Sequence, residues 1–368
     1  MPHSPAIITV TLNPAIDRII EVEGLAPGSH QEGRELLRVP AGKGINVSRA
    51  LAAMGVPSTA TGFLGDGNRA EFAAALKGLG IADEFLTLPG WTRENITLTD
   101  RRHKQDMHVR FPGLAVDRAG IERLGEILRR LTSAQPMGLR NGTSRGERPG
   151  ATLPRRVGKR VPPDCPGMLP QTTGKHGTRN GDLAGTTPIV IFSGSLPPGV
   201  APEDLADLVT ICLSGGARVA VDTSGPALGA VAAKPLWLVK PNFEELPQLV
   251  GRRLHGMKSR LLAAKALARR IPNVILSGGA KGAWLFAPGL SLHAVAPVDP
   301  QQVRSTVGCG DALLAAYVGG LAKGLDARRA FTAAVASASA SATTPGPAEF
   351  DPGVAEAIRR NAQVTELV

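Results

Sequence analysis

The sequence has few cysteines and few aromatic residues, and it contains no long hydrophobic segment. Its 368 residues include three cysteines, and aromatic side chains make up 4% of the chain. Cys165, Cys212 and Cys309 lack the spacing of metal ligands, which argues against a disulfide framework and against a zinc site. No apolar run approaches the about 20 residues of a membrane-spanning helix, and the N-terminus shows no signal-peptide pattern. These absences predict a soluble, cytoplasmic protein with no membrane partner.

The excess of positive charge is concentrated in one segment. The net charge is +11, and residues 135–187 hold nine Lys and Arg against three Asp and Glu. The same segment holds ten Gly, seven Pro and no aromatic residue. Because it cannot bury enough apolar surface to offset its ordering entropy, we predict a disordered basic insertion. A nucleic-acid-binding arm is the less favoured alternative, since basic runs without interleaved aromatic residues are usually solvated.

Short apolar runs alternate with amphipathic segments along the rest of the chain. The predicted strands, rich in β-branched residues, are 6–12, 58–64, 188–192, 218–222, 237–240, 273–276 and 283–286. The predicted helices are 48–54, 69–79, 117–131, 326–342 and 354–360. This alternation predicts an α/β protein with a mainly parallel sheet between helices. Segments 19–39 and 94–111 interrupt it and are predicted to form a small β lid, with 109–113 returning a strand to the site.

The stretch Ser-Thr-Val-Gly-Cys-Gly-Asp at 305–311 precedes the apolar run 312–321. Gly308 and Gly310 allow backbone N–H groups to crowd together where a helix begins, which favours an anion there. Asp311 would lie in the first turn, beside that anion, in a position suited to a general base for phosphoryl transfer. Taken alone, the stretch is more often a glycine-rich turn with an Asp near a helix start.

Polar residues also follow the predicted strands, at the edge where parallel sheets bind ligands. Asn13 and Asp17 follow the first strand in Asn-Pro-Ala-Ile-Asp, a pattern that by itself is more often a turn. Lys43 and Asn46 supply hydrogen-bond donors within the glycine-containing segment 41–47. Arg93 suits bidentate phosphate recognition, although an isolated arginine is by default a surface residue.

Taken together and in this order, the motifs resemble those of the ribokinase-like carbohydrate kinases, and most of all their phosphofructokinase-B branch. Three further motifs carry the resemblance: Ser-Gly-Ser-Leu-Pro-Pro-Gly at 193–199, Lys-Pro-Asn-Phe-Glu-Glu at 240–245, and Ser-Gly-Gly-Ala-Lys-Gly at 277–282. The resemblance covers nearly the whole chain except residues 135–187. It implies a three-layer ribokinase-like sandwich with a small β lid, a homodimer formed through that lid, and an ATP-dependent kinase of a ketohexose phosphate.

The resemblance also implies roles for individual residues. Asp311 would be the catalytic base, with Gly308, Cys309 and Gly310 forming an anion hole. The residues implied to bind the phosphosugar are Asn13, Asp17, Gly42, Lys43, Asn46, Arg93, Asn95 and Ser193. Those implied to bind ATP are Lys240, Asn242, Ser277, Gly279 and Gly282. Asn242 and Glu245 are implied to organise Mg²⁺ through water; from the residues alone, a helix N-terminus with an acidic first turn explains their spacing as well.

Three positions depart from the family pattern. Cys309 replaces the usual Ala or Ser, and Gly278 stands where a bulkier residue is usual. Thr97 stands where fructose-1-phosphate and tagatose-6-phosphate kinases often place a second cation.

These departures leave alternatives for the substrate. Lys43 and its Ala-Gly-Lys-Gly context favour conversion of fructose 1-phosphate to fructose 1,6-bisphosphate. Segments 91–93 and 111–113 resemble 6-phosphofructokinases instead, and tagatose-6-phosphate kinase is a further alternative. An inactive sugar-phosphate-binding protein is an alternative of another class, which the presence of Asp311, Asn242 and Glu245 argues against.

Overall fold

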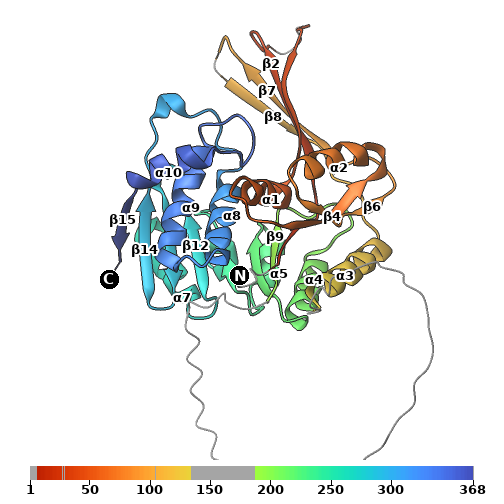
Figure 1. Ribbon diagram of the computed structural model, residues 1–368. Helices are drawn as coiled ribbons and strands as arrows, with labels where there is room; N and C mark the ends of the chain where they lie inside the picture. Colours follow the sequence, from red (N-terminus) through yellow and green to blue (C-terminus); the bar gives the residue numbers. More distant parts are fainter. Residues whose placement is uncertain (1–5, 27, 29, 104, 134–186, 368) are drawn as a thin grey trace, which may run out of the picture. The chain divides into compact units, whose positions relative to one another are not determined.

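Figure 1 shows a computed structural model of the chain, which describes residues 6–26, 28, 30–103, 105–133 and 187–367. The predicted insertion 135–187 lies outside the described residues except for Thr187. No helix in the described ranges is long and apolar enough to cross a membrane.

The larger of two main sheets is built around the first strand. β1 (Ile7–Thr11) pairs in parallel with β4 (Thr59–Gly65) on one side and with β9 (Ile189–Ser193) on the other. The strand order is β15-β14-β13-β12-β11-β10-β9-β1-β4-β5, with β6 also paired to β4. The remaining strands are β5 (Ala82–Asp83), β6 (Leu86–Leu88), β10 (Arg218–Asp222), β11 (Leu238–Val239), β12 (Asn273–Ser277), β13 (Ala283–Ala287), β14 (Leu290–Val295) and β15 (Gln363–Glu366). The sheet is parallel up to β12, and β13 to β15 form an antiparallel edge.

Helices cover both faces of this sheet, because its strands alternate apolar side chains between two layers. In β9, Ile189 and Ile191 belong to one buried cluster, and Val190 and Phe192 belong to the other. The first cluster includes residues of α1 (Lys43–Ala53), α8 (Cys309–Ala322), α9 (Ala327–Ser341) and α10 (Pro352–Arg360). The second includes residues of α3 (Arg118–Thr132), α4 (Pro202–Ser214), α5 (Pro226–Val231), α6 (Leu246–Val250) and α7 (Gly256–Leu267). The predicted three-layer α/β sandwich is therefore confirmed.

α2 (Arg69–Gly78) packs in a third, smaller cluster with β4 and α1. Short 3₁₀ turns lie at Asp66–Asn68, Gly279–Lys281 and Pro300–Gln302.

A separate sheet of four strands, here called the small sheet, has the order β3-β2-β7-β8. Its strands are β2 (Ala15–Val22), β3 (Arg34–Ala41), β7 (Glu94–Asp100) and β8 (Gln105–Arg110). They occupy the two segments that were expected to form a lid, with different bounds. β2 starts at Ala15 rather than near Ile19, and β8 ends at Arg110 instead of continuing through 109–113. Pro112 lacks an N–H group for the sheet, which favours the earlier end.

Candidate active site

Polar residues from distant parts of the chain meet at the carboxyl ends of the parallel strands. A Cβ on Gly42 would lie 2.8 Å from Thr11 Cγ2 and 3.0 Å from Pro14 Cα, so the loops after β1 and β3 are in close contact. A Cβ on Gly310 would lie 3.2 Å from Lys240 Nζ, which brings the loop after β11 to the start of α8. This is the sheet edge at which the sequence predicts a ligand.

The turn before Asp311 adopts, at Gly308, a backbone geometry that only glycine allows. Gly308 precedes α8 in the left-handed conformation, with φ 82°. A Cβ there would lie 2.3 Å from the backbone N of Ala348, so a side chain would collide with the main chain. Asp311 lies in the first turn of α8 and is 4% exposed. Asn46 Nδ2 donates a hydrogen bond of 2.9 Å to its Oδ2, joining residues that are 265 positions apart.

The surroundings of Asp311 bring its ionisation close to neutral pH. The pKa of Asp311 is raised to about 7, mainly by burial and in addition by the charge of Asp222. Lys43, the hydrogen bond from Asn46, and Lys240 act in the opposite direction on this pKa. A carboxyl group with a pKa near the working pH suits general-base catalysis.

Asp222, the last residue of β10, received no role from the sequence. It is 1% exposed, with Oδ1 3.5 Å from Lys43 Nζ and Oδ2 3.1 Å from Lys240 Nζ. The carboxylate thereby holds two ammonium groups close to the glycine-rich turn, which suits a site for phosphate oxygens. Its position at the carboxyl end of a correctly predicted strand is the signal that could have identified it.

Asp17 and Asn95 lie side by side on β2 and β7 of the small sheet. Asn95 Nδ2 donates a hydrogen bond of 2.8 Å to Asp17 Oδ1. Burial raises the pKa of Asp17, while this hydrogen bond and the charges of Arg49, Arg93 and Arg110 lower it. Asp17 was expected just past the end of the first strand, whereas it belongs to β2. There its carboxylate has cationic neighbours.

Several buried polar atoms in this region lack hydrogen-bond partners among the described residues. Among them are Oδ1 of Asn13, Oδ1 of Asn95 and Oγ of Ser193. Asn13 uses its amide group instead, donating to Ser195 Oγ at 3.2 Å and to the carbonyl of Leu196 at 3.1 Å. Because a buried polar atom without a partner costs free energy, these atoms indicate where ligand hydroxyl groups would bind.

Arg93 anchors the segment that immediately precedes β7. Its Nε, Nη1 and Nη2 donate to the carbonyls of Pro14, Phe111 and Asn13 at 3.3, 3.1 and 3.3 Å. The guanidinium therefore ties three segments together, a role that the sequence did not indicate. Burial lowers the pKa of Arg93, and nearby Asp17 raises it.

Arg110 is a second cation that the sequence analysis missed. It pairs with Asn95 across β7 and β8, so both side chains lie on the same face of the small sheet. The alternation of residues in β8 is the signal that could have placed it there.

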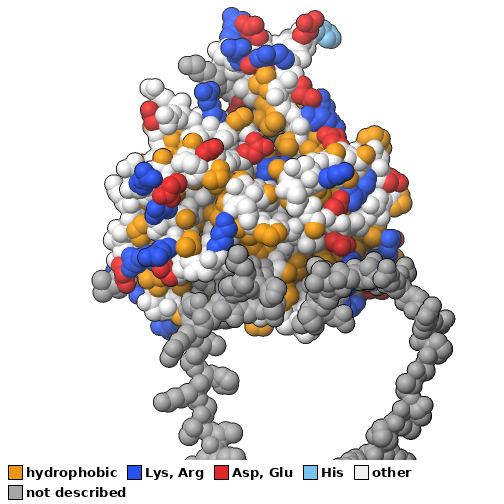
Figure 2. Space-filling view, viewed as in Figure 1, with side chains coloured by type: hydrophobic (Ala, Val, Ile, Leu, Met, Phe, Trp, Pro, Cys, Tyr) orange, Lys and Arg blue, Asp and Glu red, His pale blue; other side chains and the backbone are white. Residues whose placement is uncertain are grey.

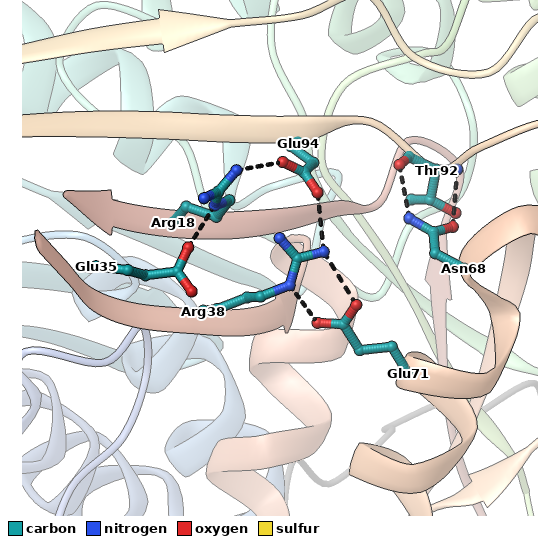
Figure 3. A network of polar contacts seen from close by, with 7 residues as sticks. All are labelled: Arg18, Glu35, Arg38, Asn68, Glu71, Thr92 and Glu94. Carbon is teal, nitrogen blue, oxygen red and sulfur yellow. Dashed lines mark hydrogen bonds and ion pairs between the residues drawn. The ribbon is translucent and has the colours of Figure 1, made fainter. Parts of the chain in front are cut away.

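Figure 3 shows the contacts of Thr92 and Glu94, which precede and follow Arg93 in the sequence. Asn68 Nδ2 donates to the carbonyl of Thr92 at 2.9 Å, and the N–H of Thr92 donates to Asn68 Oδ1 at 3.0 Å. Alongside this buried pair, an ion-pair network joins the small sheet to α2. Its contacts are Arg18–Glu35 at 2.6 Å, Arg18–Glu94 at 3.0 Å, Arg38–Glu94 at 2.8 Å and Arg38–Glu71 at 3.0 Å. The contact of Arg38 with Glu71 therefore connects the small sheet to α2.

On the predicted nucleotide side, Asn242 and Glu245 cap each other. Asn242 Oδ1 accepts from the N–H groups of Glu244 and Glu245 at 2.8 Å, and Glu245 Oε2 accepts from the N–H of Asn242 at 2.9 Å. This is a reciprocal capping arrangement at a helix start. Among the described residues there is no group of three or more His, Cys, Asp or Glu side chains that could hold a metal. Asn242 and Glu245 therefore fit Mg²⁺ only as an ion that is held mainly by water and by nucleotide phosphates.

The loop between β12 and β13 lies beside Asn242, which bridges to Ser277. Gly279 and Gly282 have positive φ angles of 60° and 82°, and a Cβ on Gly282 would lie 2.1 Å from the carbonyl of Ala294. A Cβ on Gly278 would lie 2.7 Å from the ring of Trp284 and 2.9 Å from that of Phe243. These aromatic rings leave no room for a side chain at position 278 in their present positions.

Cys309 is half-buried, and its Sγ lies 3.9 Å from the carbonyl of Ser305. Burial raises the pKa of its thiol to about 11, so the side chain is a neutral thiol at neutral pH. Nothing around the sulfur gives it a chemical task, and the position contributes backbone to the turn.

Comparison with known proteins places this geometry in a family. The model of the pfkB family carbohydrate kinases matches residues 9–120 and 170–352. The 1-phosphofructokinase of Rhodobacter capsulatus is 33% identical over 322 residues, which are 87% of this chain and 85% of that protein. The 1-phosphofructokinase of Haemophilus influenzae is 30% identical over 98% of this chain and 99% of that protein.

Solved structures agree with the fold. Phosphofructokinase-2 from Escherichia coli in complex with potassium has a TM-score of 0.78 at 25% identity, covering 97% of this chain and 99% of that one. Arabidopsis thaliana ribokinase complexed with ribose and ATP has a TM-score of 0.63 at 17% identity, covering 97% and 99%. At that identity the ribokinase supports the fold alone.

Proposed function

Because the chain belongs to the pfkB family of carbohydrate kinases, we propose that it phosphorylates a ketohexose phosphate, with fructose 1-phosphate preferred. Membership of a kinase family implies the use of ATP. The 1-phosphofructokinases at 30–33% identity support the choice of substrate. The observation that carries the proposal is Asp311, a buried carboxyl group beside a glycine turn and two lysines, with a pKa raised by burial to about 7.

In this proposal Asp311 accepts the proton of the attacking sugar hydroxyl. A sugar hydroxyl is a poor nucleophile at neutral pH, and a carboxylate within hydrogen-bond reach removes its proton as it attacks. The backbone N–H groups of Gly308, Cys309 and Gly310 stabilise the charge on the transferring phosphoryl group without reorganising. Lys240, held by Asp222, adds positive charge next to that turn.

The sugar would bind across the small sheet and the ends of β1 and β9. Its hydroxyl groups would supply the missing hydrogen bonds of Asn13, Asn95 and Ser193 and would donate to Asp17. We assign the phosphate to Arg93, which immediately precedes β7, and to Arg110, which pairs with Asn95 across β7 and β8. Gly42 and the helix start that it precedes would allow the sugar to approach the backbone closely.

We assign the nucleotide to Lys240, Asn242 and the loop 277–282. Asn242 and Glu245 would hold Mg²⁺ through water molecules, because one oxygen of Glu245 already accepts a backbone N–H group. When bound, the ion would neutralise charge on the nucleotide phosphates.

The small sheet would act as the lid and as the contact between two copies of the chain, working in the cytoplasm. Its face opposite Asn95 carries Ile96, Leu98, Met107 and Val109, paired across β7 and β8. Met107 is 50% exposed and Val109 36%. Figure 2 shows apolar side chains exposed among charged ones on one face of the molecule. An exposed apolar sheet face is typical of an interface.

The experiment is a coupled ADP-release assay with fructose 1-phosphate, fructose 6-phosphate, tagatose 6-phosphate and unphosphorylated fructose. We expect the highest kcat/KM with fructose 1-phosphate and little turnover of free fructose. Turnover of none of the phosphosugars would contradict the proposed function. A preference for a 6-phosphate would retain the kinase but correct its substrate.

A further inference from the structure

We propose that Arg49 is a positioning residue that fixes the amide of Asn46 so that its NH₂ group faces the catalytic base. The inference rests on the proposed function, in which Asp311 is that base. Arg49 lies in α1, three residues after Asn46, and is 5% exposed. Neither the motifs of the sequence nor the steps proposed above give it a role.

The guanidinium of Arg49 is held by three acceptors from three parts of the chain. Its Nη1 donates to Asn46 Oδ1 and to the carbonyl of Pro347, both at 3.1 Å. Its Nη2 donates to the carbonyl of Pro40 at 2.5 Å. These contacts form one line of hydrogen bonds, from Arg49 to Asn46 and from Asn46 to Asp311.

The direction of this line is determined by Arg49, because a guanidinium can only donate hydrogen bonds. Asn46 must therefore turn its oxygen toward Arg49, which leaves its NH₂ group for the carboxylate. If the amide were reversed, Asn46 Oδ1 would face the carboxylate of Asp311, and the two acceptors would repel each other. Arg49 thus selects the one amide orientation that stabilises ionised Asp311.

Arg49 also supports the turn at Gly308, which precedes Asp311. Pro347 accepts its hydrogen bond, and the neighbouring Ala348 lies against Gly308, where a Cβ would come within 2.3 Å of its backbone N. The same guanidinium thus holds Asn46 and the segment that packs on the start of α8. Both contacts position Asp311.

The guanidinium is buried, and in the described part of the chain its one ion pair is long. Its Nε lies 4.0 Å from Oε1 of Glu349, whose side chain is 46% exposed. Burial lowers the pKa of Arg49, while the charges of Glu349, Asp17 and Asp311 raise it. A buried charge so weakly paired is costly for stability. Its hydrogen bonds to Asn46 and to two backbone carbonyls give it a reason to be there.

The test is the pH profile of kcat for Arg49→Met, which removes the donors but keeps a long apolar side chain. Of the charged groups around Asp311, Asp222, Lys43 and Lys240 remain, while the variant also removes the charge of Arg49, which itself acts on Asp311. With the amide of Asn46 free to reverse, the pKa of Asp311 should rise. The limb of the profile that reports ionisation of the base should therefore move to higher pH by about one unit. Starting from a pKa of about 7, that shift means about a fivefold loss of kcat at pH 7 and recovery near pH 9.

The Asn46→Ala background separates positioning from the direct effect of the Arg49 charge. In Asn46→Ala no amide remains to be oriented, so Arg49→Met should shift the limb much less than it does when Asn46 is present, by the direct effect of the charge alone. Arg359→Met, an exposed arginine paired with Glu356 on α10, serves as the control for loss of one distant positive charge and should leave the limb in place. A shift of the same size in the Asn46→Ala background, or loss of kcat by the same factor at every pH, would overturn the proposal.

Arg49→Lys covers the case in which Arg49→Met does not fold. Lysine keeps the charge but cannot reach three separate acceptors, so we expect a smaller shift in the same direction. An unchanged limb in this variant would also count against positioning. The wild-type enzyme distinguishes the two claims: inactivity on every phosphosugar defeats the proposed function, whereas an active wild type with unshifted variants defeats only the role of Arg49.

Discussion

Two buried carboxyl groups at the end of the sheet have different electrostatic tasks. Asp222 lies between the ammonium groups of Lys43 and Lys240 and balances their charges. Asp311 accepts a hydrogen bond from the neutral amide of Asn46, and burial is the main cause that raises its pKa to about 7. This raised pKa makes Asp311 a group that can exchange a proton near neutral pH.

This raised pKa predicts a stability difference that depends on pH. Between about pH 4 and pH 7 the folded protein keeps a proton on Asp311 that the unfolded chain has released. The free energy of unfolding of the wild type should therefore decrease as pH rises through that window. Asp311→Asn has no proton to lose. Its melting temperature relative to wild type should be higher at pH 8 than at pH 5, by a few degrees.

Calorimetry at the two pH values measures this difference directly. Asp351→Asn serves as a control, because Asp351 is an exposed N-cap of α10. A difference between Asp311→Asn and wild type that is the same at both pH values would show that Asp311 ionises normally in the folded protein.

Arg93 is predicted to bind the phosphate of the substrate, and the structure adds a second consequence of its loss. Arg93→Ala should weaken phosphosugar binding by about 2 to 3 kcal/mol and raise the KM for the sugar far more than that for ATP. It should also loosen the contacts with Asn13, Pro14 and Phe111. Arg93→Lys retains the charge without the forked geometry and should give an intermediate KM. Equal changes in the two KM values would contradict the assignment.

The contacts between candidate site residues could not be predicted, because the partners are distant in the sequence. Asn46 and Asp311 are 265 residues apart, and Asp222 lies 179 residues from Lys43. Local patterns place each of them at a strand or helix end, and only the fold brings them together. Asp311, Asn46 and Lys43 were proposed as site residues because their motifs resemble a family. Asp222, Arg49 and Arg110 received no role from these motifs.

At the scale of the elements, strands buried on both faces were the easiest to predict. β10 has the predicted bounds, and β1, β4, β9, β12 and β13 differ from theirs by one or two residues at an end. Continuous β-branched runs give these strands a clear signal. β15 has mostly exposed side chains and, among the described strands, pairs with β14 alone, so no apolar run marks it in the sequence.

α1 was predicted to begin at Ser48, whereas it begins at Lys43. Gly44 within its first turn is typical of a loop when the sequence is considered alone. In the fold, a Cβ at that position would lie 2.3 Å from Thr11 Oγ1, so glycine is required by contact with β1. Helices α4 and α7 were not assigned either. In α7, polar and apolar residues are poorly separated, with Leu262 58% exposed.

Residues 135–187 are predicted to be dispensable for chemistry. The elements on either side of them, α3 and β9, contribute Leu128 and Val190 to the same buried cluster. Replacing 135–187 with a flexible Gly/Ser linker should leave kcat/KM within about threefold, since linkers of that composition impose little structure. The measurement compares kinetics and melting temperature with the full chain. A folded but inactive variant would assign the segment a part in the reaction.

At the scale of the whole molecule, the fold class and the family were predicted correctly. The alternation of strands and helices and the order of the motifs can both be recognised in the local sequence. The association of two copies is a property of surfaces, and here it remains a prediction. Met107→Asp places a charge on the exposed apolar face of the small sheet. Sedimentation should show a shift from dimer to monomer.

Leu262→Asp on α7 is the matched control for that variant, as Leu262 is 58% exposed on a different element. It should leave the dimer intact. A wild-type protein that is monomeric at all concentrations, or two variants that dissociate equally, would contradict an interface through the small sheet.

The central claim is that Asp311 is the base of a phosphosugar kinase, and single-turnover and steady-state kinetics of Asp311→Asn test it most directly. The variant keeps the shape of the side chain but cannot accept the proton. On the best phosphosugar its kcat should fall by about 10² to 10⁴-fold while ATP affinity changes little. A matched Cys309→Ala variant should remain active, since that position contributes only backbone. Near-normal kcat in Asp311→Asn would contradict the account.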